Sequence, residues 1–190
     1  MRKLVSFMHV SLDGFVAGLN GEMNWIKVDA EIFDYVGQMI DQSEMAVYGR
    51  VTYQMMEAYW PTAGDKPNAT KHDKQHSAWY SRINKIIVSR SMEGQQVPKS
   101  QITGSDVENT IRKNKDQPGG LMVIFGSPST THYLTQHDLV DEFWLFVNPI
   151  LLGEGIPMFK GISGRVNLKL ADSKTFASGV EMLHYEVIRK

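Results

Sequence analysis

Short apolar runs and segments with helical periodicity alternate along this chain of 190 residues. The apolar runs are rich in Val, Ile, Phe or Met and predict strands at Lys3–Val10, Met45–Tyr48, Lys85–Ser89, Leu121–Phe125 and Glu142–Val147. The segments between them predict helices at Ala30–Gln42, Val51–Ala58, Ser77–Arg82, Asp106–Asn114 and Thr130–Gln136. Strands that alternate with helices are typical of an α/β sheet with parallel crossovers.

The first predicted helix divides into two faces. Its apolar positions are Ile32, Val36, Met39 and Ile40, and its polar positions are Glu31, Asp34, Gln38 and Asp41. Because residues three and four apart lie on one side of a helix, the apolar positions form a single stripe. We therefore expect this helix to pack on a sheet.

The end of the chain has a different pattern. Val166–Phe176 and Val180–Arg189 are strand-like runs, and Ala177-Ser178-Gly179 between them predicts an antiparallel hairpin. The predicted fold class is therefore α/β: a mixed, mostly parallel sheet flanked by helices, with an antiparallel C-terminal hairpin. Pro61–Gln75 and Ser91–Ser105 are polar and predict surface loops rather than linkers, so residues 1–190 are expected to form a single domain.

Composition narrows the classes of function. The chain has no cysteine, which excludes disulfides, thiolate catalysis and cysteine-based metal sites and favours a reducing compartment. With 20 basic and 21 acidic side chains, the net charge of −1 gives no general attraction for nucleic acid. Since neither a signal peptide nor a run of about 20 apolar residues is visible, we expect a cytoplasmic protein without membrane or nucleic-acid partners.

No metal site is expected. The chain has no glycine-rich dinucleotide motif, no Walker motif and no His, Asp or Glu group with the spacing of metal ligands. His72 and His76 stand at positions i and i+4 of a possible helix, but their stretch is rich in Lys and Gln. This setting favours a solvated face over a metal site.

Three predicted strands end in groups that suit a phosphate. Gly49-Arg50-Val51-Thr52-Tyr53 opens a helix after one strand, and Gly126-Ser127-Pro128-Ser129-Thr130 opens a helix after another. Glycine lets a backbone approach a ligand, and the free amides of a helix start attract anions. The third strand ends in Ser89-Arg90-Ser91, where Arg90 suits a 2′-phosphate. The alternatives are a tight turn with an exposed arginine, a serine that only caps its helix, and a solvated loop arginine.

Several motifs occur in one order and together resemble a known family. They are Met8-His9-Val10-Ser11-Leu12-Asp13-Gly14-Phe15-Val16-Ala17-Gly18, Met23-Asn24-Trp25, Gly49-Arg50-Val51-Thr52-Tyr53, Ile87-Val88-Ser89-Arg90, Phe125-Gly126-Ser127 and Pro149-Ile150-Leu151-Leu152-Gly153-Glu154-Gly155-Ile156-Pro157-Met158-Phe159. The ordered set covers nearly the whole chain and resembles the dihydrofolate-reductase-like superfamily. The branch is the one similar to the C-terminal reductase domain of riboflavin-biosynthesis deaminase–reductases.

The resemblance implies an NADPH-dependent oxidoreductase and a place for its cofactor. The residues implied to hold the cofactor's phosphates are Gly49, Arg50, Val51, Thr52, Gly126 and Ser127. Ser89 and Arg90 would hold the adenosine end with its 2′-phosphate, and backbone groups of Val16 and Ala17 would meet the nicotinamide. The loop from Gly14 to Trp25 would cover the nicotinamide.

The candidates for substrate binding and catalysis are Asp13, Trp25, Asp29 and Glu154, with Tyr53 as a further wall. Reduction of a C=N or C=O bond needs a hydride and a proton. Dihydrofolate reductases carry a carboxylate in the first helix. Counting from Trp25 places it at Ala30, beside Asp29 and Glu31, whereas counting back from Gly49 places it at Phe33, beside Asp34. Asp29 suits a helix N-cap equally well, and Glu31 and Asp34 lie on the polar face. Asp13-Gly14 alternatively forms only a turn, and Trp25 and Tyr53 alternatively pack in the core.

The expected function is therefore NADPH-dependent reduction of a small heterocyclic substrate, either a ribosylamino-pyrimidine as in 5-amino-6-(5-phosphoribosylamino)uracil reductases or a pterin as in dihydrofolate reductases. One alternative is a nucleotide-binding or regulatory module of the same fold without turnover, and another is a flavin- or phosphate-binding protein of a different family. The aromatic run Phe143–Val147 suits a homodimer, and burial under helices explains it equally well.

Overall fold

The computed structural model describes residues 1–189 and contains ten strands and five helices within that range. The strands are β1 (Leu4–Ser11), β2 (Phe15–Ala17), β3 (Ser43–Gly49), β4 (Asn84–Val88), β5 (Ser100–Thr103), β6 (Leu121–Phe125), β7 (Glu142–Asn148), β8 (Ile156–Pro157), β9 (Leu168–Thr175) and β10 (Glu181–Val187). The helices are α1 (Ala30–Asp41), α2 (Arg50–Ala63), α3 (Lys71–Arg82), α4 (Val107–Lys115) and α5 (Pro128–Gln136).

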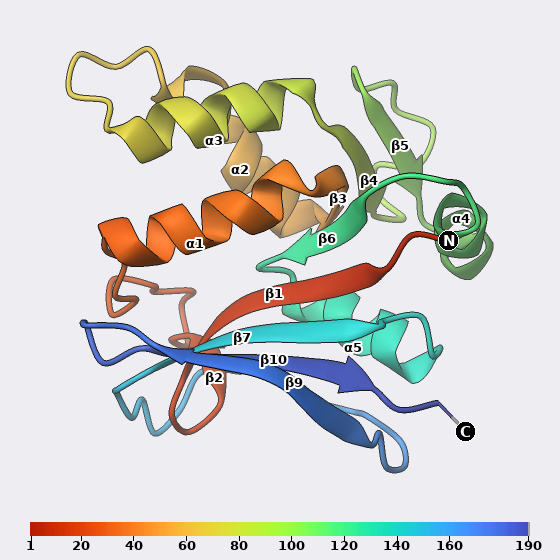
Figure 1. Ribbon diagram of the computed structural model, residues 1–190. Helices are drawn as coiled ribbons and strands as arrows, with labels where there is room; N and C mark the ends of the chain where they lie inside the picture. The colour runs from red at the N-terminus through yellow and green to blue at the C-terminus, as the bar shows by residue number, and fades with distance from the viewer. Residues whose placement is uncertain (190) are drawn as a thin grey trace.

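One mixed sheet organises the molecule, with the strand order β5-β4-β3-β6-β1-β7-β10-β9. The first six strands in this order are mutually parallel, and β10 is antiparallel to both β7 and β9. In Figure 1 the arrow of β10 accordingly points the opposite way from that of β6. The predicted fold class, a mostly parallel sheet with an antiparallel C-terminal hairpin, is confirmed.

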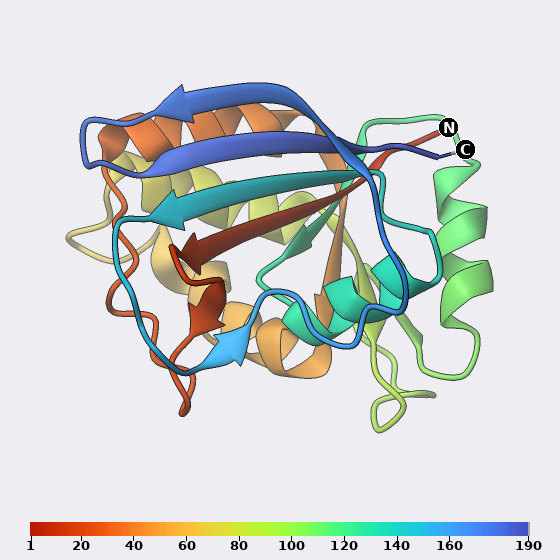
Figure 2. The same ribbon diagram turned by 90° about the horizontal axis from the view of Figure 1, so that it is seen from below.

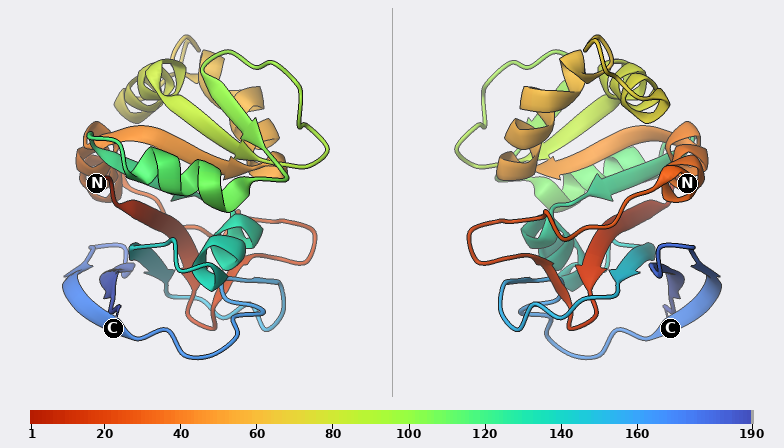
Figure 3. Two further views of the ribbon diagram at one scale, coloured as in Figure 1. Left: turned by 90° about the vertical axis from the view of Figure 1, so that its right-hand side faces the viewer. Right: turned by 90° about the vertical axis from the view of Figure 1, so that its left-hand side faces the viewer.

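The central parallel strands are covered on both faces, as parallel strands require, whereas the edge strand β9 is largely exposed. Side chains of α1, α2 and α3 pack on one face, where Ile32, Tyr53 and Trp79 join Phe7 of β1 in one core. Side chains of α4 and α5 pack on the other face, in a second core with Leu4 of β1. The β9–β10 hairpin lies at the far end of the sheet from β4 and β5 (Figure 3).

Helix α1 follows its sequence pattern closely. The four apolar positions Ile32, Val36, Met39 and Ile40 are all buried, whereas Glu31 and Asp41 are exposed. The expectation that this helix packs on a sheet is confirmed. The aromatic run in β7 is explained in a similar way, because β7 lies inside the sheet between β1 and β10 and buries Phe143 and Phe146.

The predictions that Pro61–Gln75 and Ser91–Ser105 are loops without regular structure are both wrong. Within Pro61–Gln75, α2 continues through Pro61 to Ala63, and α3 already begins at Lys71. The start of α3 is fixed by a capping box, in which Thr70 and Asp73 each accept a hydrogen bond from the other's backbone N–H. Within Ser91–Ser105 the chain forms β5, which pairs with β4 as an edge strand. Both segments are rich in polar residues, and this masked their regular structure.

The solvated face predicted for His72 and His76 is also wrong. His76 is buried, and its ring centroid lies 3.9 Å from that of Trp60 on α2. The ring of His72 stacks on Phe33 of α1 at 3.7 Å. Because α3 packs between α1 and α2, these histidines serve as aromatic packing groups rather than as surface side chains.

A small antiparallel pair, β2 with β8, was not predicted. It lies beyond the carboxyl end of β1 and joins the segment after β1 to the segment after β7 (Figure 2). None of the helices of residues 1–189 is long and apolar enough to cross a membrane.

The amino end of the sheet is held by the carboxylate of Asp141. This carboxylate accepts a hydrogen bond from the Leu4 backbone at 2.7 Å and pairs with the ammonium of Lys115 at 2.6 Å and the guanidinium of Arg189 at 2.5 Å. Burial by itself raises the pKa of Asp141, but these hydrogen bonds outweigh it, and the net pKa lies below the ordinary value. Asp141 thus joins β1, α4, the start of β7 and the segment after β10.

We expect Asp141→Asn to lower the free energy of unfolding at pH 7 by about 3 kcal/mol, because it leaves two cations without their buried partner. The folded pKa of Asp141 is depressed, so its contribution is present above the unfolded pKa of about 4 and is lost as the pH falls through the folded value. Urea unfolding at pH 7 and pH 3 measures both effects. The exposed Asp138, which pairs with Arg189 at 3.0 Å, provides the control, since Asp138→Asn is expected to cost less than about 1 kcal/mol. Equal costs for the two variants would contradict the assignment.

Candidate functional site

The site lies where β1 and β6 separate at the carboxyl edge of the sheet. The ladder between them ends at the pair Phe7 and Phe125, whereas β1 continues to Ser11 with only β7 beside it. The β6 chain turns away at Gly126, whose φ of 54° lies in the left-handed region that glycine adopts without strain. Ligands of open α/β sheets bind at such points, outside the carboxyl ends of the strands.

Two helix starts meet beside this opening. The Gly49 backbone N–H donates to the hydroxyl of Ser127 at 3.0 Å, and the hydroxyl of Thr52 donates to the carbonyl of Gly126 at 2.9 Å. Gly49 and Ser127 are the N-cap residues of α2 and α5, and neither makes a side-chain cap hydrogen bond. The first amides of both helices are therefore left for another acceptor, which is the arrangement that binds a phosphate.

Gly49 is required by the space available. A Cβ at this position would lie 2.8 Å from the hydroxyl oxygen of Thr130, and the hydroxyl oxygens of Ser127 and Ser129 lie within 4 Å of it. The backbone thus forms a cradle with three hydroxyls around it. Val51 and Arg50, the next residues of α2, are exposed, and the Arg50 guanidinium donates to Gln54 of the same helix at 3.0 Å.

Ser89 and Arg90 follow β4 at the same edge of the sheet. Ser89 is buried and its hydroxyl accepts the Met92 backbone N–H at 3.2 Å, so the serine shapes the turn. Arg90 is exposed. Its backbone packs against the end of β5, where a Cβ on Gly104 would lie 2.5 Å from the Arg90 Cα.

An internal carboxylate already occupies an anion-binding turn beside Arg90. Glu93 accepts the backbone N–H groups of Gly104 and Ser105, each at 3.1 Å, and the Ser105 hydroxyl at 2.7 Å. The hydroxyl of Ser105 is the strongest of these influences, and together they lower the pKa of Glu93. This end of the sheet therefore accommodates negative charge.

Asp13 joins two loops of the candidate site. Its carboxylate accepts the backbone N–H of Gly153 at 2.7 Å and that of Leu152 at 3.1 Å, together with the Ser11 hydroxyl at 2.6 Å. The Ser11 hydroxyl has the largest effect, and the pKa of Asp13 is lowered. Gly14, with φ of 87°, completes the turn that the sequence left as an alternative. Glu154 is exposed next to this contact.

The segment between β1 and α1 carries the remaining candidates. Val16 and Ala17 are buried in β2, and a Cβ on Gly155 would lie 2.3 Å from the Ala17 carbonyl oxygen. Trp25 is half-buried, and its indole N–H donates to the Glu22 carbonyl at 3.0 Å. Trp25 is therefore a loop residue and not part of either core, unlike Tyr53, which packs in the core of α1, α2 and α3.

Asp29 is the N-cap of α1. Its carboxylate accepts the Ile32 backbone N–H at 2.9 Å, as an N-cap aspartate does. The two other carboxylates near the start of this helix are paired with lysines, Glu31 with Lys174 at 3.0 Å and Asp34 with Lys71 at 3.1 Å. The carboxylates at the start of α1 thus all have a partner within the chain.

Two polar residues at strand ends, His9 and Asn148, are not among the site residues predicted from the sequence. His9 lies near the end of β1 and Asn148 ends β7, and the Asn148 side chain is within 3.4 Å of the His9 ring. Burial lowers the pKa of His9 to about 4. The sequence feature that could have identified them is that each is a polar residue near the carboxyl end of an otherwise apolar strand.

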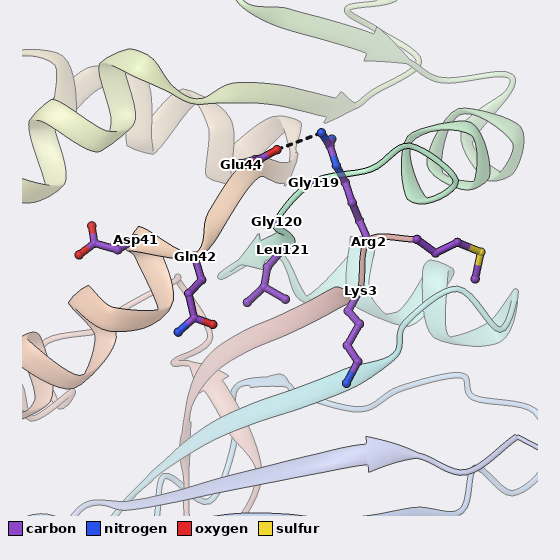
Figure 4. A pocket seen from close by; sticks show the side chains of 9 residues that line it. Arg2, Lys3, Asp41, Gln42, Glu44, Gly119, Gly120 and Leu121 are labelled. Carbon is purple, nitrogen blue, oxygen red and sulfur yellow. Dashed lines mark hydrogen bonds and ion pairs between the residues drawn. The ribbon is translucent and has the colours of Figure 1, made fainter.

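A depression of about 480 Å³ lies at the opposite, amino edge of the sheet (Figure 4). The ion pair between Arg2 and Glu44, at 3.1 Å, crosses it. A Cβ on Gly120 would lie 2.3 Å from the Gln42 carbonyl oxygen, so the chain segments pack closely here. The depression is thus remote from the carboxyl edge, where the candidate residues gather.

Comparison with known proteins agrees with this geometry. Residues 2–182 match the model of the RibD C-terminal domain family. The chain belongs to the RibD C-terminal domain family. The uncharacterized Bacillus subtilis protein YyaP is 30% identical over 188 residues, which are 97% of this chain and 94% of that protein.

Solved structures show the same fold at low identity. A pyrimidine reductase-like protein from Corynebacterium diphtheriae has a TM-score of 0.69 and 15% identity, and the match covers 100% of this chain and 93% of that one. A Thermotoga maritima diaminohydroxyphosphoribosylaminopyrimidine deaminase/5-amino-6-(5-phosphoribosylamino)uracil reductase has a TM-score of 0.69 and 14% identity, over 98% of this chain and 57% of that one. Enterococcus faecalis dihydrofolate reductase, complexed with NADP(H), has a TM-score of 0.61 and 16% identity, over 98% and 97%. The fold of this RibD C-terminal domain is therefore that of reductases.

The cradle at Gly49 yields a prediction for stability. Gly49→Ala is expected to lower the free energy of unfolding by about 1–3 kcal/mol, because its methyl group overlaps the Thr130 hydroxyl. Thr130→Ala removes that hydroxyl, so the double variant is expected to be more stable than the sum of the two single costs predicts. Urea unfolding of the four proteins measures this coupling, and additive costs would contradict the close contact.

Proposed function

We propose that this protein is an NADPH-dependent reductase, which transfers a hydride to a small heterocyclic, ribosylamino-pyrimidine or pterin-like substrate. The observation that carries the proposal is the meeting of two uncapped helix starts beside the opening between β1 and β6. Membership of a family whose relatives of the same fold include reductases supports it. The predicted cytoplasmic location and homodimer stay predictions.

The residues fit a dinucleotide with two phosphates. A backbone cradle that has no room for a Cβ at Gly49, with uncapped amides on either side of it, suits a pyrophosphate. In this proposal the residues that hold the pyrophosphate are Gly49, Arg50, Val51, Thr52, Gly126 and Ser127. Ser89 and Arg90 hold the adenosine end with its 2′-phosphate, and Val16 and Ala17 meet the nicotinamide through their backbone groups.

NADPH, when bound, supplies the hydride, and the chain supplies orientation and charge. Asp13 fixes the loop of residues 152 and 153 against the end of β1. In this proposal Trp25, in the segment before α1, covers the nicotinamide. Asp29 orders the first turn of α1 beside the substrate. Glu154 is the exposed carboxylate of this group, at the rim.

A binding module without turnover is the second candidate, and one observation favours it. The carboxylates of Asp13 and Asp29 both accept hydrogen bonds from backbone N–H groups, so neither is free to donate a proton to a substrate. Oxidation of NADPH, followed by its absorbance in the presence of 5-amino-6-(5-phosphoribosylamino)uracil or dihydrofolate, distinguishes the two. Steady turnover rules out the module, whereas NADPH binding without oxidation by either compound favours it.

Arg90→Ala is expected to weaken NADPH binding by about 30-fold, since it removes a charge-assisted hydrogen bond to the 2′-phosphate. NADH lacks this phosphate, so its affinity is expected to change by less than about 3-fold. Titration followed by nicotinamide fluorescence measures both affinities.

Arg82→Ala serves as the matched control for this prediction. Arg82 is an exposed arginine at the end of α3 and is expected to affect neither cofactor. Equal weakening of NADPH and NADH by Arg90→Ala would refute the role of Arg90. Absence of NADPH binding by the unaltered protein would refute the proposed cofactor.

A further inference from the structure

His9 is the last ring on the α1 side of β1 before the open end of the site. Its side chain lies on the same face as Phe7, at 5.7 Å between ring centroids, and next to Phe146 of β7, at 5.1 Å. Beyond Phe7, β1 has no β6 partner. The His9 ring therefore contacts Phe7 and Phe146 on the side of the core. On its other side lies the opening where β1 and β6 have separated.

The two ring nitrogens of His9 have different surroundings. Nδ1 lies 3.4 Å from the side-chain amide nitrogen of Asn148. Nε2 has no hydrogen-bond partner within residues 1–189, and the ring keeps some exposure to solvent. His76 is different, because both of its nitrogens are completely buried without a partner. His9 thus combines a nitrogen that contacts Asn148 with one that is accessible to a ligand.

Asn148 determines which nitrogen of His9 carries the proton. The Asn148 carbonyl oxygen accepts the Lys27 backbone N–H at 2.8 Å, and its amide nitrogen donates to the Phe146 carbonyl at 3.0 Å. These two bonds orient the amide, so that its nitrogen and not its oxygen faces Nδ1 of His9. The same nitrogen lies 3.4 Å from the Val10 carbonyl oxygen, so its two hydrogens face three acceptors. Because an amide nitrogen only donates, its approach to Nδ1 favours an unprotonated Nδ1, and we infer that the neutral ring carries its proton on Nε2.

The same asparagine also holds the segment that covers the site. Lys27 lies two positions after Trp25, and its ammonium donates to the Ser178 carbonyl in the β9–β10 turn at 3.4 Å. Asn148 is completely buried, so it links the ring of His9 to the covering segment through one rigid side chain. This connection joins parts of the chain that are far apart in the sequence.

We propose that His9 is a catalytic hydrogen-bond donor, whose Nε2–H binds the nitrogen or oxygen of the substrate double bond that is reduced, with Asn148 as its positioning residue. The inference rests on the proposed function and deepens it. It gives the substrate a required feature, which is a hydrogen-bond acceptor at the reducible C=N or C=O bond. A neutral imidazole that polarises an acceptor is a known way to stabilise developing negative charge.

Reduction of the double bond in this way needs no acidic side chain as a proton donor. The carbon of the double bond takes the hydride of NADPH, and the electron pair of the π bond moves to the nitrogen or oxygen held by His9. That atom then takes a proton from water, and solvent neutralises the hydroxide that is left. Burial is the cause of the low pKa of His9, about 4, so the ring is neutral at pH 7 and keeps its Nε2 proton throughout.

Nitrogen NMR of ¹⁵N-histidine-labelled protein tests the state of the ring directly. We expect His9 to be neutral with its proton on Nε2 from pH 8 down to about pH 5, and its ring signals to shift when NADP⁺ saturates the protein. Asn148→Asp is expected to move the proton to Nδ1, because a carboxylate only accepts. A proton on Nδ1 in the unaltered protein, or a charged ring at pH 7, would overturn the proposal.

Kinetics with NADPH and either 5-amino-6-(5-phosphoribosylamino)uracil or dihydrofolate test the role in turnover. His9→Phe keeps an aromatic ring but removes the donor, and is expected to lower kcat by about 100-fold with little change in the KM for NADPH. His9→Gln restores an N–H donor and is expected to recover about 10-fold of that loss. A kcat for His9→Phe close to that of the unaltered protein would overturn the proposal.

His76→Phe is the matched control, since it replaces another buried neutral histidine that packs on Phe125 at 6.1 Å between ring centroids. It is expected to change the free energy of unfolding but not kcat.

NADPH fluorescence in the same samples tests cofactor binding separately from the role of His9. Failure of the unaltered protein to bind NADPH refutes the proposed function, whereas binding that leaves the His9 signals unmoved refutes the role of His9 alone.

Discussion

The separation of β1 from β6 is the constraint on which the rest of the site depends. As long as the two strands pair, from Leu4 to Phe7, their backbone groups satisfy one another and the space between helices is filled by core side chains. Past Phe7 the chain must supply other partners for β1. The Asn148 amide donates to the Val10 carbonyl at 3.4 Å, and the Gly14 backbone N–H of the turn after β1 donates to the Ser11 carbonyl at 3.0 Å.

The carboxylates of Asp13 and Asp29 both accept backbone N–H groups, and this restricts their chemistry. Asp13 binds two amides of the segment before β8, and Asp29 binds an amide of α1. A carboxylate that accepts such bonds is stabilised as an anion, as the lowered pKa of Asp13 illustrates. A group of this kind positions loops well but holds a proton poorly, so acid catalysis by Asp13 would work against its structural role.

The sequence predicted the parts of the fold that depend on local pattern. Leu121–Phe125 is a strand with the expected limits because its apolar run continues to Phe125 and Met122 to Phe125 are buried, and α1 follows its apolar stripe. The Gly49 and Gly126 junctions were recognisable because a glycine between an apolar strand and a helix start lets the backbone turn and approach a ligand. By contrast, α3 begins in Lys71-His72-Asp73-Lys74, where the capping box with Thr70 outweighs a composition typical of loops. The strand β5 has only four residues and depends on pairing with β4.

The pairing of His9 with Asn148 could not be read from the sequence, since the two residues are brought together only by the β1–β7 register. In that register His9 stands opposite Phe146, and Asn148 reaches back to it from the strand end. The state of the imidazole is then a consequence of the fold, because the Lys27 backbone orients the amide and burial removes the charge. A site whose carboxylates are committed to backbone amides and whose histidine is held neutral is suited to hydrogen-bond polarisation, with water as the source of the proton.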